Sequence, residues 1–128
     1  MTAPPIRTFK DLLVWQKAMD LSVEVYHLTK NYPSPERYGL TAETRKTLRS
    51  VPCNIAEGHK RGSTSEYIRF LGIAAGSAGE LETQLPLAGR LGYLKQGTAG
   101  VCPYAAKALR LTDGTSKLTE ALIAELKK

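Results

Sequence analysis

Hydrophobic residues recur at helical spacing along most of the chain. From Asp11 onward, apolar residues follow one another at alternating steps of four and three positions, which is typical of a helix that buries one face. This series is Val14, Ala18, Leu21, Val25 and Leu28. A second, partly apolar series, Trp15, Met19, Ser22 and Tyr26, lies about 100° round the same helix. The two series indicate either a wide core face or a helix that packs on two sides, which would favour self-association.

Two prolines separate this helix from the next one. The segment NYPSPERYG contains Pro33 and Pro35, which disfavour helical geometry in the residues before them. We predict that the second helix begins near Thr41, a suitable N-cap, and ends around Gly62. Glu43 then lies in the first turn, where the helix dipole favours a negative charge. The inward-facing series of this helix is Thr44, Leu48, Val51, Ile55 and Gly58.

The third helix has the clearest pattern. Ser63 and Glu66 fit a capping box at its start. Its series is Tyr67, Leu71, Ala74, Ala78, Leu81, Leu85 and Ala88. The middle of the helix, GIAAGSAGELE, is rich in Gly, Ala and Ser. Each glycine costs about 1 kcal/mol of helix stability relative to alanine, but small residues let a neighbouring helix approach closely.

The fourth segment follows the turn LGYLKQGTAG and has a weaker pattern. Its series is Val101, Tyr104, Ala108, Leu111, Thr115, Leu118 and Leu122, with Thr112, Gly114 and Thr115 lowering helix propensity in the middle. No alternating strand pattern is present. Four helices with short connections predict an all-α fold, an antiparallel up-down-up-down four-helix bundle. We expect residues 1–10 to form a flexible N-terminal tail and residues 11–128 a single domain.

A proline lies in the middle of the second helix, beside a polar stripe. Pro52 has no amide hydrogen, so the carbonyl of Leu48 loses its helical partner and the helix should bend. The stripe is Ser50, Asn54, Glu57 and Arg61. It allows three interpretations: a polar seam that fixes helix register or a subunit contact, a ligand or nucleic-acid site, or catalysis, for which companion residues are missing. We favour a structural seam, formed by Asn54, Glu57 and Glu80.

The charge balance suggests which partners to expect. The chain has 18 Lys and Arg against 12 Asp and Glu, a net charge of +6. This excess favours anionic partners, nucleic acid before acidic membranes, although it could also serve solubility alone. Basic residues cluster on the second helix, whereas Glu66, Glu80 and Glu82 lie on the third. The candidates for phosphate contact are Arg45, Lys46, Arg49, Lys60 and Arg61; the alternative is an ordinary solvated helix face.

Residues for catalysis or metal binding are sparse. The two cysteines, Cys53 and Cys102, are far apart, and the two histidines, His27 and His59, lie in different segments. The motifs of zinc proteases, P-loop proteins, serine hydrolases and di-iron bundles are missing. We therefore predict no catalytic residue, no metal and no cofactor. Without a signal-peptide pattern or a long apolar run, we also expect a cytoplasmic protein that has reduced thiols and does not contact a membrane.

Four stretches resemble the bacterial four helix bundle proteins, also called 23S rRNA intervening-sequence proteins. They are FKDLLVWQKAMDLSVEVYHLT, ERYGLTAETRK, SVPCNIAEGHKR and EYIRFLGIAAGSAGELETQLPLAGRLGYL. The resemblance extends from about Phe9 to Leu94, and its NIAEG and GSAxELExQL-like blocks are specific. The matched positions include Trp15, Tyr38, Gly39, Leu40, Asn54, Glu57, Gly58, Arg61, Phe70, Glu80, Glu82, Gly92 and Tyr93.

The resemblance implies a four-helix bundle that assembles into a ring-like homopentamer, encoded in some bacteria within an insert of the large ribosomal RNA gene. A related protein, the accessory variability determinant of diversity-generating retroelements, binds nucleic acid and a reverse transcriptase through a basic barrel surface. No catalytic residue is established for the family, so none is implied here. After Leu94 the sequence departs from the family, because TAGVCPYAAKALRLTDGTSK is small, apolar and thinly charged where relatives carry a charged helical tail.

Two functions follow from these observations. The first is a non-enzymatic cytosolic homo-oligomer, a pentamer by the resemblance, that binds the backbone of RNA or DNA through a basic surface. The second is an adaptor or structural assembly protein with a protein partner and no nucleic-acid role. Its interface would be the exposed apolar stripes of the first and third helices and the small-residue patch from Gly72 to Gly79. An enzyme is the weakest hypothesis.

Overall fold

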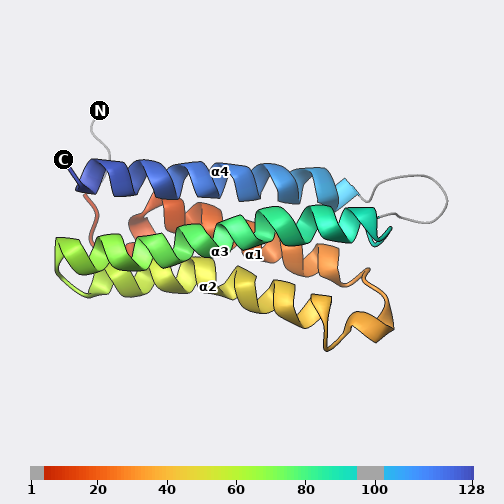
Figure 1. Cartoon of the computed structure of the whole chain (residues 1–128). Coiled ribbons are helices and arrows are strands. Elements are labelled where there is room, and N and C mark those ends of the chain that lie inside the picture. The colour runs from red at the N-terminus through yellow and green to blue at the C-terminus, as the bar shows by residue number, and fades with distance from the viewer. Residues whose placement is uncertain (1–4, 95–102) are drawn as a thin grey trace.

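The computed structural model describes residues 5–94 and 103–128, and the regular elements in these ranges are all helical. They are the 3-10 helix η1 (Phe9–Asp11), α1 (Leu13–Thr29), the 3-10 helix η2 (Ser34–Glu36), α2 (Leu40–Lys60), α3 (Thr64–Arg90) and α4 (Pro103–Leu126). Figure 1 shows that consecutive α-helices run in opposite directions, with the start of α1 and the end of α4 at the same end of the molecule. The predicted all-α class is confirmed. The predicted core position Val101 lies outside the described residues.

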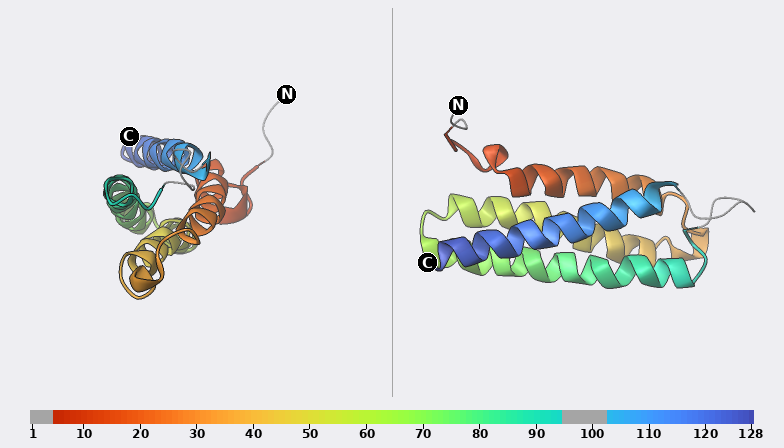
Figure 2. Two further views of the ribbon diagram at one scale, coloured as in Figure 1. Left: turned by 90° about the vertical axis from the view of Figure 1, so that its right-hand side faces the viewer. Right: turned by 90° about the horizontal axis from the view of Figure 1, so that it is seen from above.

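Each α-helix packs against two neighbours. Helix α1 lies between α2 and α4, and α3 also lies between α2 and α4, so the four helices surround one interior. Figure 2 shows this arrangement along the bundle axis and from the side. Because η1 also contacts both α1 and α2, the N-terminal segment is fastened to the end of the bundle where α2 finishes.

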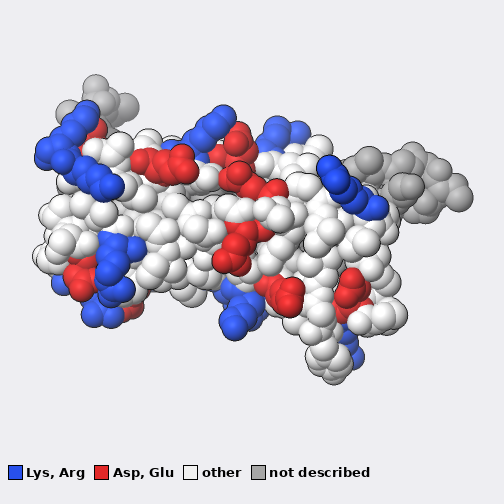
Figure 3. Space-filling view, viewed as in Figure 1, with Lys and Arg blue, Asp and Glu red and all other residues white. Residues whose placement is uncertain are grey.

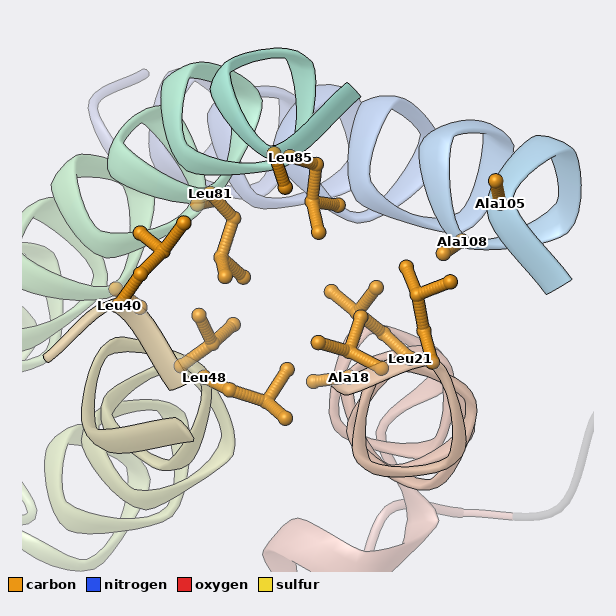
Figure 4. Packing of buried hydrophobic residues seen from close by; sticks show 14 of the residues in the cluster. Ala18, Leu21, Leu40, Leu48, Leu81, Leu85, Ala105 and Ala108 are labelled. Atoms are coloured by element: carbon orange, nitrogen blue, oxygen red, sulfur yellow. The ribbon is translucent and has the colours of Figure 1, made fainter. Parts of the chain in front are cut away.

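In α1, α2 and α3 the interior is filled by the apolar series that the sequence predicts. On α4 the prediction is only partly right, because Leu111, Leu118 and Leu122 are half-buried while Ala105, Thr112 and Thr119 are buried. Every residue of the first series on α1 is buried, as are all five inward positions of α2 and the α3 positions from Leu71 to Ala88. Figure 4 shows side chains from all four helices converging, among them Leu21, Leu48, Leu81 and Ala108. Burial of these side chains is the main favourable term in the stability of such a bundle.

Helix α4 is continuous despite its weak pattern. Its buried face includes Thr112, Thr115, Ser116 and Thr119. The hydroxyl of Thr112 donates to the carbonyl oxygen of Ala108 at 2.7 Å, and that of Thr119 donates to the carbonyl oxygen of Thr115 at 2.7 Å. These bonds to the helix's own backbone allow two polar side chains to be buried without a partner from another helix.

The ends of α2 and α3 differ in part from the expectation. Helix α2 begins at Leu40 with Gly39 as its N-cap, so the prediction of Thr41 as N-cap is wrong, and Thr41 is buried inside the helix. Ser63 does cap α3, because its hydroxyl accepts from the backbone N–H of Glu66 at 3.2 Å. The Glu66 carboxylate accepts from Arg69 at 2.9 Å and not from the Ser63 N–H, so only the Ser63 half of the predicted capping box is formed.

Pro52 is buried within α2, and the helix continues through it from Leu40 to Lys60. Figure 1 shows the two halves of α2 inclined to one another, as expected where a proline removes one helical hydrogen bond. Among the helices of residues 5–94 and 103–128, none is long and apolar enough to cross a membrane.

Candidate functional site

The five predicted phosphate contacts do not form one surface. They all lie on or just after α2, but their side chains divide among four neighbourhoods. Arg45 and Arg49 face α1, Lys46 lines a groove beside α3, and Lys60 lines a pocket with the N-terminal segment. Arg61, at the end of α2, lies against α3. The neighbourhoods differ in how far each basic side chain is already engaged by other residues of the protein, and therefore in how freely it could bind a phosphate.

Arg45 and Arg49 are held by residues of α1. The Nε of Arg45 donates to the hydroxyl of Thr29 at 2.9 Å, and its guanidinium lies over the ring of Tyr26, 4.6 Å from the centroid. A terminal nitrogen of Arg49 donates to the hydroxyl of the same tyrosine at 2.9 Å. Arg45 is half-buried and Arg49 is exposed. Arg45 therefore joins α1 to α2, while Arg49 keeps N–H groups that a phosphate could reach.

Arg61 is likewise engaged within the protein. It forms an ion pair with Glu57 at 2.9 Å, and its guanidinium lies 4.9 Å from the centroid of the Phe70 ring. Arg69 stacks on the same ring at 4.4 Å. The Glu57–Arg61 pair is about half exposed, so it contributes little to stability.

Lys60 belongs to a basic pocket at one end of the bundle. The pocket has a volume of about 440 Å³ and is lined by Arg7, Thr8, Phe9, Lys10, His59 and Lys60. We call it the N-terminal basic pocket. None of the lining side chains is acidic, and three of them, Arg7, Lys10 and Lys60, carry a permanent positive charge at neutral pH. A concave site with this charge suits a phosphate group.

A capping box holds the wall of this pocket in place. The Thr8 hydroxyl accepts from the N–H of Lys10 at 3.2 Å. The Asp11 carboxylate accepts from the N–H groups of Arg7 and Thr8 at 2.9 and 3.1 Å. The ring of Phe9 packs edge-on against Trp15, with 5.4 Å between centroids. These contacts order two basic residues that the sequence pattern places in a loose tail; the Thr8-x-x-Asp11 spacing was the signal that could have revealed them.

The same hydrogen bonds give a testable pH dependence. The N–H groups of Arg7 and Thr8 lower the pKa of the Asp11 carboxyl below its ordinary value of 3.8. Because the folded pKa is depressed, this contribution to stability is present above the ordinary pKa and is lost as pH falls through the folded pKa. We expect NMR titration to give a pKa for Asp11 below 3.8. An ordinary pKa, or an unchanged acid limb of the stability curve in Asp11→Asn, would contradict the capping box.

A polar groove of about 390 Å³ separates α2 from α3 on another face. Here the hydroxyls of Ser50 and Ser77 are 2.7 Å apart, and the Asn54 side-chain amide donates to the backbone carbonyl of Ser50 at 2.7 Å and to its hydroxyl at 2.9 Å. Nearby, the Thr47 hydroxyl shares its proton between the backbone carbonyl of Glu43 at 3.0 Å and the carboxylate of Glu80 at 3.3 Å, and it accepts from the amide of Gln84 at 3.2 Å. We call this network the α2–α3 polar seam.

Asn54 and Glu80, predicted as seam residues, both make hydrogen bonds in the α2–α3 polar seam, whereas Glu57 pairs with Arg61 outside it. Thr47, Ser77 and Gln84 were not predicted, because helical spacing on α2 does not reveal which α3 residue lies opposite. Lys46 and Glu43 line the same groove. The mixed charges make this groove a poorer phosphate site than the N-terminal basic pocket.

Removing the amide of Asn54 should weaken the α2–α3 contact. We expect Asn54→Ala to lower the free energy of unfolding by about 1 kcal/mol, since the carbonyl and the half-buried hydroxyl of Ser50 lose a donor. Chemical denaturation measures the change. Glu57→Ala is the matched control on the same helix, with an expected loss below about 0.5 kcal/mol. Equal losses in the two variants would show that Asn54 has no special role.

Charge is unevenly distributed over the surface. Figure 3 shows Asp and Glu gathered in the middle of the face formed by α2, α3 and α4, with Lys and Arg mainly toward its ends and edges. Within the described part of the chain, no three His, Cys, Asp or Glu side chains are grouped to hold a metal ion. Cys53 is an exposed free thiol, and Cys102 lies outside the described residues.

Comparison with known proteins adds two findings. Residues 10–102 match the model of a family described as 23S rRNA-intervening sequence protein. In structure, the chain is similar to a protein of unknown function from the S23 ribosomal protein family of Bacteroides thetaiotaomicron, with a TM-score of 0.74 and 21% sequence identity over 87% of this chain and 98% of the other. At that identity the likeness supports the fold alone. Among curated proteins, none matches the chain in sequence.

Proposed function

Because the chain belongs to the 23S rRNA-intervening sequence protein family, we propose that it is a non-enzymatic cytoplasmic protein that binds the phosphate backbone of RNA or DNA. The observation that carries this proposal is the N-terminal basic pocket, which Arg7, Lys10 and Lys60 line together and whose lining includes no acidic residue. Together with a net charge of +6, it gives the chain a concave anionic-ligand site on a basic protein.

The chemistry of the pocket fits a nucleotide chain. Arg and Lys bind phosphate oxygens through charge-assisted hydrogen bonds, which position a nucleic acid without reading its sequence. The Phe9 ring lines the same pocket and offers an apolar surface for a ribose or a base. Arg49 and Lys46 are exposed on α2 and can add backbone contacts. Arg45 and Arg61 serve mainly to hold α1, α2 and α3 together.

Assembly would strengthen this binding. We propose a homo-oligomer, a pentamer by resemblance to relatives, in which the basic pockets of several subunits repeat around one axis. Summing +6 per subunit raises the local potential and the association rate with polyanions.

The proposal is tested by capture of tagged protein from a cell lysate, with and without nuclease treatment. We expect bound RNA or DNA to be recovered, and any co-purifying proteins to be lost after nuclease treatment, since they would be held through the nucleic acid. Protein partners that survive nuclease, with no nucleic acid recovered, would contradict the proposal.

One surface favours a protein partner as the second candidate function. On the outer face of α3, a Cβ atom added at Gly72, Gly76 or Gly79 would meet nothing within 4 Å, and Ile73 and Leu87 are exposed on the same helix. Three glycines on the exposed face of a helix lower the stability of that helix, and they would allow another helix to approach closely. Nuclease-resistant capture of one protein would support this adaptor function.

A further inference from the structure

A second cationic pocket lies on the opposite side of α1 from α2, in the groove between α1 and α4. It has a volume of about 320 Å³ and is lined by Lys17, Lys107, Arg110, Leu111, Gly114 and Thr115. We call it the α1–α4 pocket. It shares no residue with the N-terminal basic pocket or the α2–α3 polar seam. All of its lining residues except Lys17 lie on α4, beyond residue 102, where the family match ends.

The positive charge of this pocket is largely uncompensated. Lys17 and Arg110 form no ion pair with any residue in the described ranges, while Lys107 contacts the buried carboxylate of Glu24 at 3.6 Å. The only carboxylate next to the lining in sequence, Asp113, is paired with Lys117 at 3.0 Å. Lys17 projects from one helix and Arg110 from its neighbour, so two free cations flank the groove from opposite sides.

Thr115 forms the bottom of this groove. It is 1% exposed, and its Oγ1 is covered by protein atoms and has no hydrogen-bond partner. Thr112 and Thr119 on the same helix instead donate to their own backbone. A ligand in the groove would therefore meet the cations of the two walls and not the Thr115 hydroxyl.

We propose that the α1–α4 pocket binds a small oxyanion of the phosphate class. Arg110 and Lys17 supply charge-assisted hydrogen bonds from the two walls, and Lys107 adds a third cation. Gly114 leaves room for the ligand, because a Cβ atom added there would meet nothing within 4 Å. The proposed ligand is a small solute, and its binding does not depend on nucleic-acid binding at the N-terminal basic pocket.

NMR titration of the full-length, nucleic-acid-free protein tests the proposal, with inorganic phosphate at constant ionic strength. We expect saturable shifts at the amides of Gly114 and Thr115. A Lys17→Gln, Arg110→Gln double variant should weaken binding about tenfold or more. Thr115→Val should leave the phosphate affinity unchanged, because the hydroxyl is covered by protein atoms, and should melt no lower than the unmodified protein without phosphate, because it removes an unpaired buried hydroxyl.

A Lys127→Gln, Lys128→Gln double variant is the matched control, since it also removes two positive charges, lies just beyond the far end of α4 outside the pocket, and is expected to leave phosphate affinity unchanged. A parallel titration with adenosine monophosphate distinguishes a free phosphate from one carried on a nucleotide, according to which of the two binds more tightly. Shifts that do not saturate, or that are the same in the pocket double variant and in this control, would overturn the proposal. Because these readouts need no RNA or DNA, they stand or fall separately from the proposed nucleic-acid binding.

Discussion

Replacing Gly58 by alanine is expected to destabilise the protein by about 1–3 kcal/mol, even though alanine is the better helix former. A Cβ atom at this position would lie 2.8 Å from the Cβ of Phe70 and 3.3 Å from both the ring and the backbone oxygen of Tyr67. The Phe70 Cβ is fixed by the backbone of α3 and cannot move away alone. Helices α2 and α3 would therefore have to separate where Gly58 faces Phe70 and Tyr67.

Chemical denaturation of Gly58→Ala and Gly76→Ala, measured side by side, tests this expectation. Gly76 lies in the middle of α3, where an added Cβ atom meets nothing within 4 Å. The same substitution there should raise the free energy of unfolding by about 0.5–1 kcal/mol through helix propensity alone. Opposite signs for the two variants are the expected result. A stabilising Gly58→Ala would show that α2 and α3 do not pack as closely as described.

Gly58 also connects the fold to the candidate site. The next residue, His59, packs edge-on against Tyr67 with 5.6 Å between ring centroids, and His59 and Lys60 line the N-terminal basic pocket. The close approach of α3 to the end of α2 therefore positions one wall of that pocket. The glycine of the NIAEG block has a packing role that needs no ligand.

The second large effect is expected in nucleic-acid affinity. Replacing Arg7, Lys10 and Lys60 together by glutamine should weaken binding to structured RNA about tenfold or more at moderate salt, because three phosphate contacts are lost. The slope of log affinity against log salt should become shallower by about 2–3 for the same reason. Fluorescence anisotropy with labelled RNA over a salt series measures both quantities.

A control with the same change in net charge separates the pocket from the overall charge. Lys30, Arg37 and Lys117 lie outside the N-terminal basic pocket, and their triple glutamine variant also removes three positive charges. We expect it to bind RNA more tightly than the pocket variant. Equal losses in both triple variants would mean that the bulk charge, and not the N-terminal basic pocket, determines binding.

The core was predictable because burial repeats with the helical period. The positions from Val14 to Leu28 and from Leu48 to Ile55 follow one face of each helix, and that face has to be covered whatever the neighbour. The start of α2 was not predictable in the same way. Glycine at position 39 serves as the N-cap without a side-chain bond, while the threonine that looks like a cap is buried.

The site was only partly predictable, since sequence spacing gives the face of a helix and not its partner. Arg45 and Arg49 look like free basic residues, yet both contact Tyr26, which precedes them by 19 and 23 positions in sequence. Substituting them would disturb the α1–α2 contact as well as any phosphate contact. Arg7 and Lys10 were overlooked because a proline-rich start suggests a tail, whereas Thr8 and Asp11 order this segment.

Binding of the unmodified protein to labelled structured RNA and duplex DNA, followed by fluorescence anisotropy across a salt series, tests the central claim most directly. The account predicts a dissociation constant of about one micromolar or tighter at low salt, and an affinity that falls steeply as salt rises because phosphate contacts release counterions. Lack of binding to both nucleic acids even at low salt would contradict the account. The net charge of +6 would then serve solubility, and the glycine face of α3 would become the surface on which to seek a protein partner.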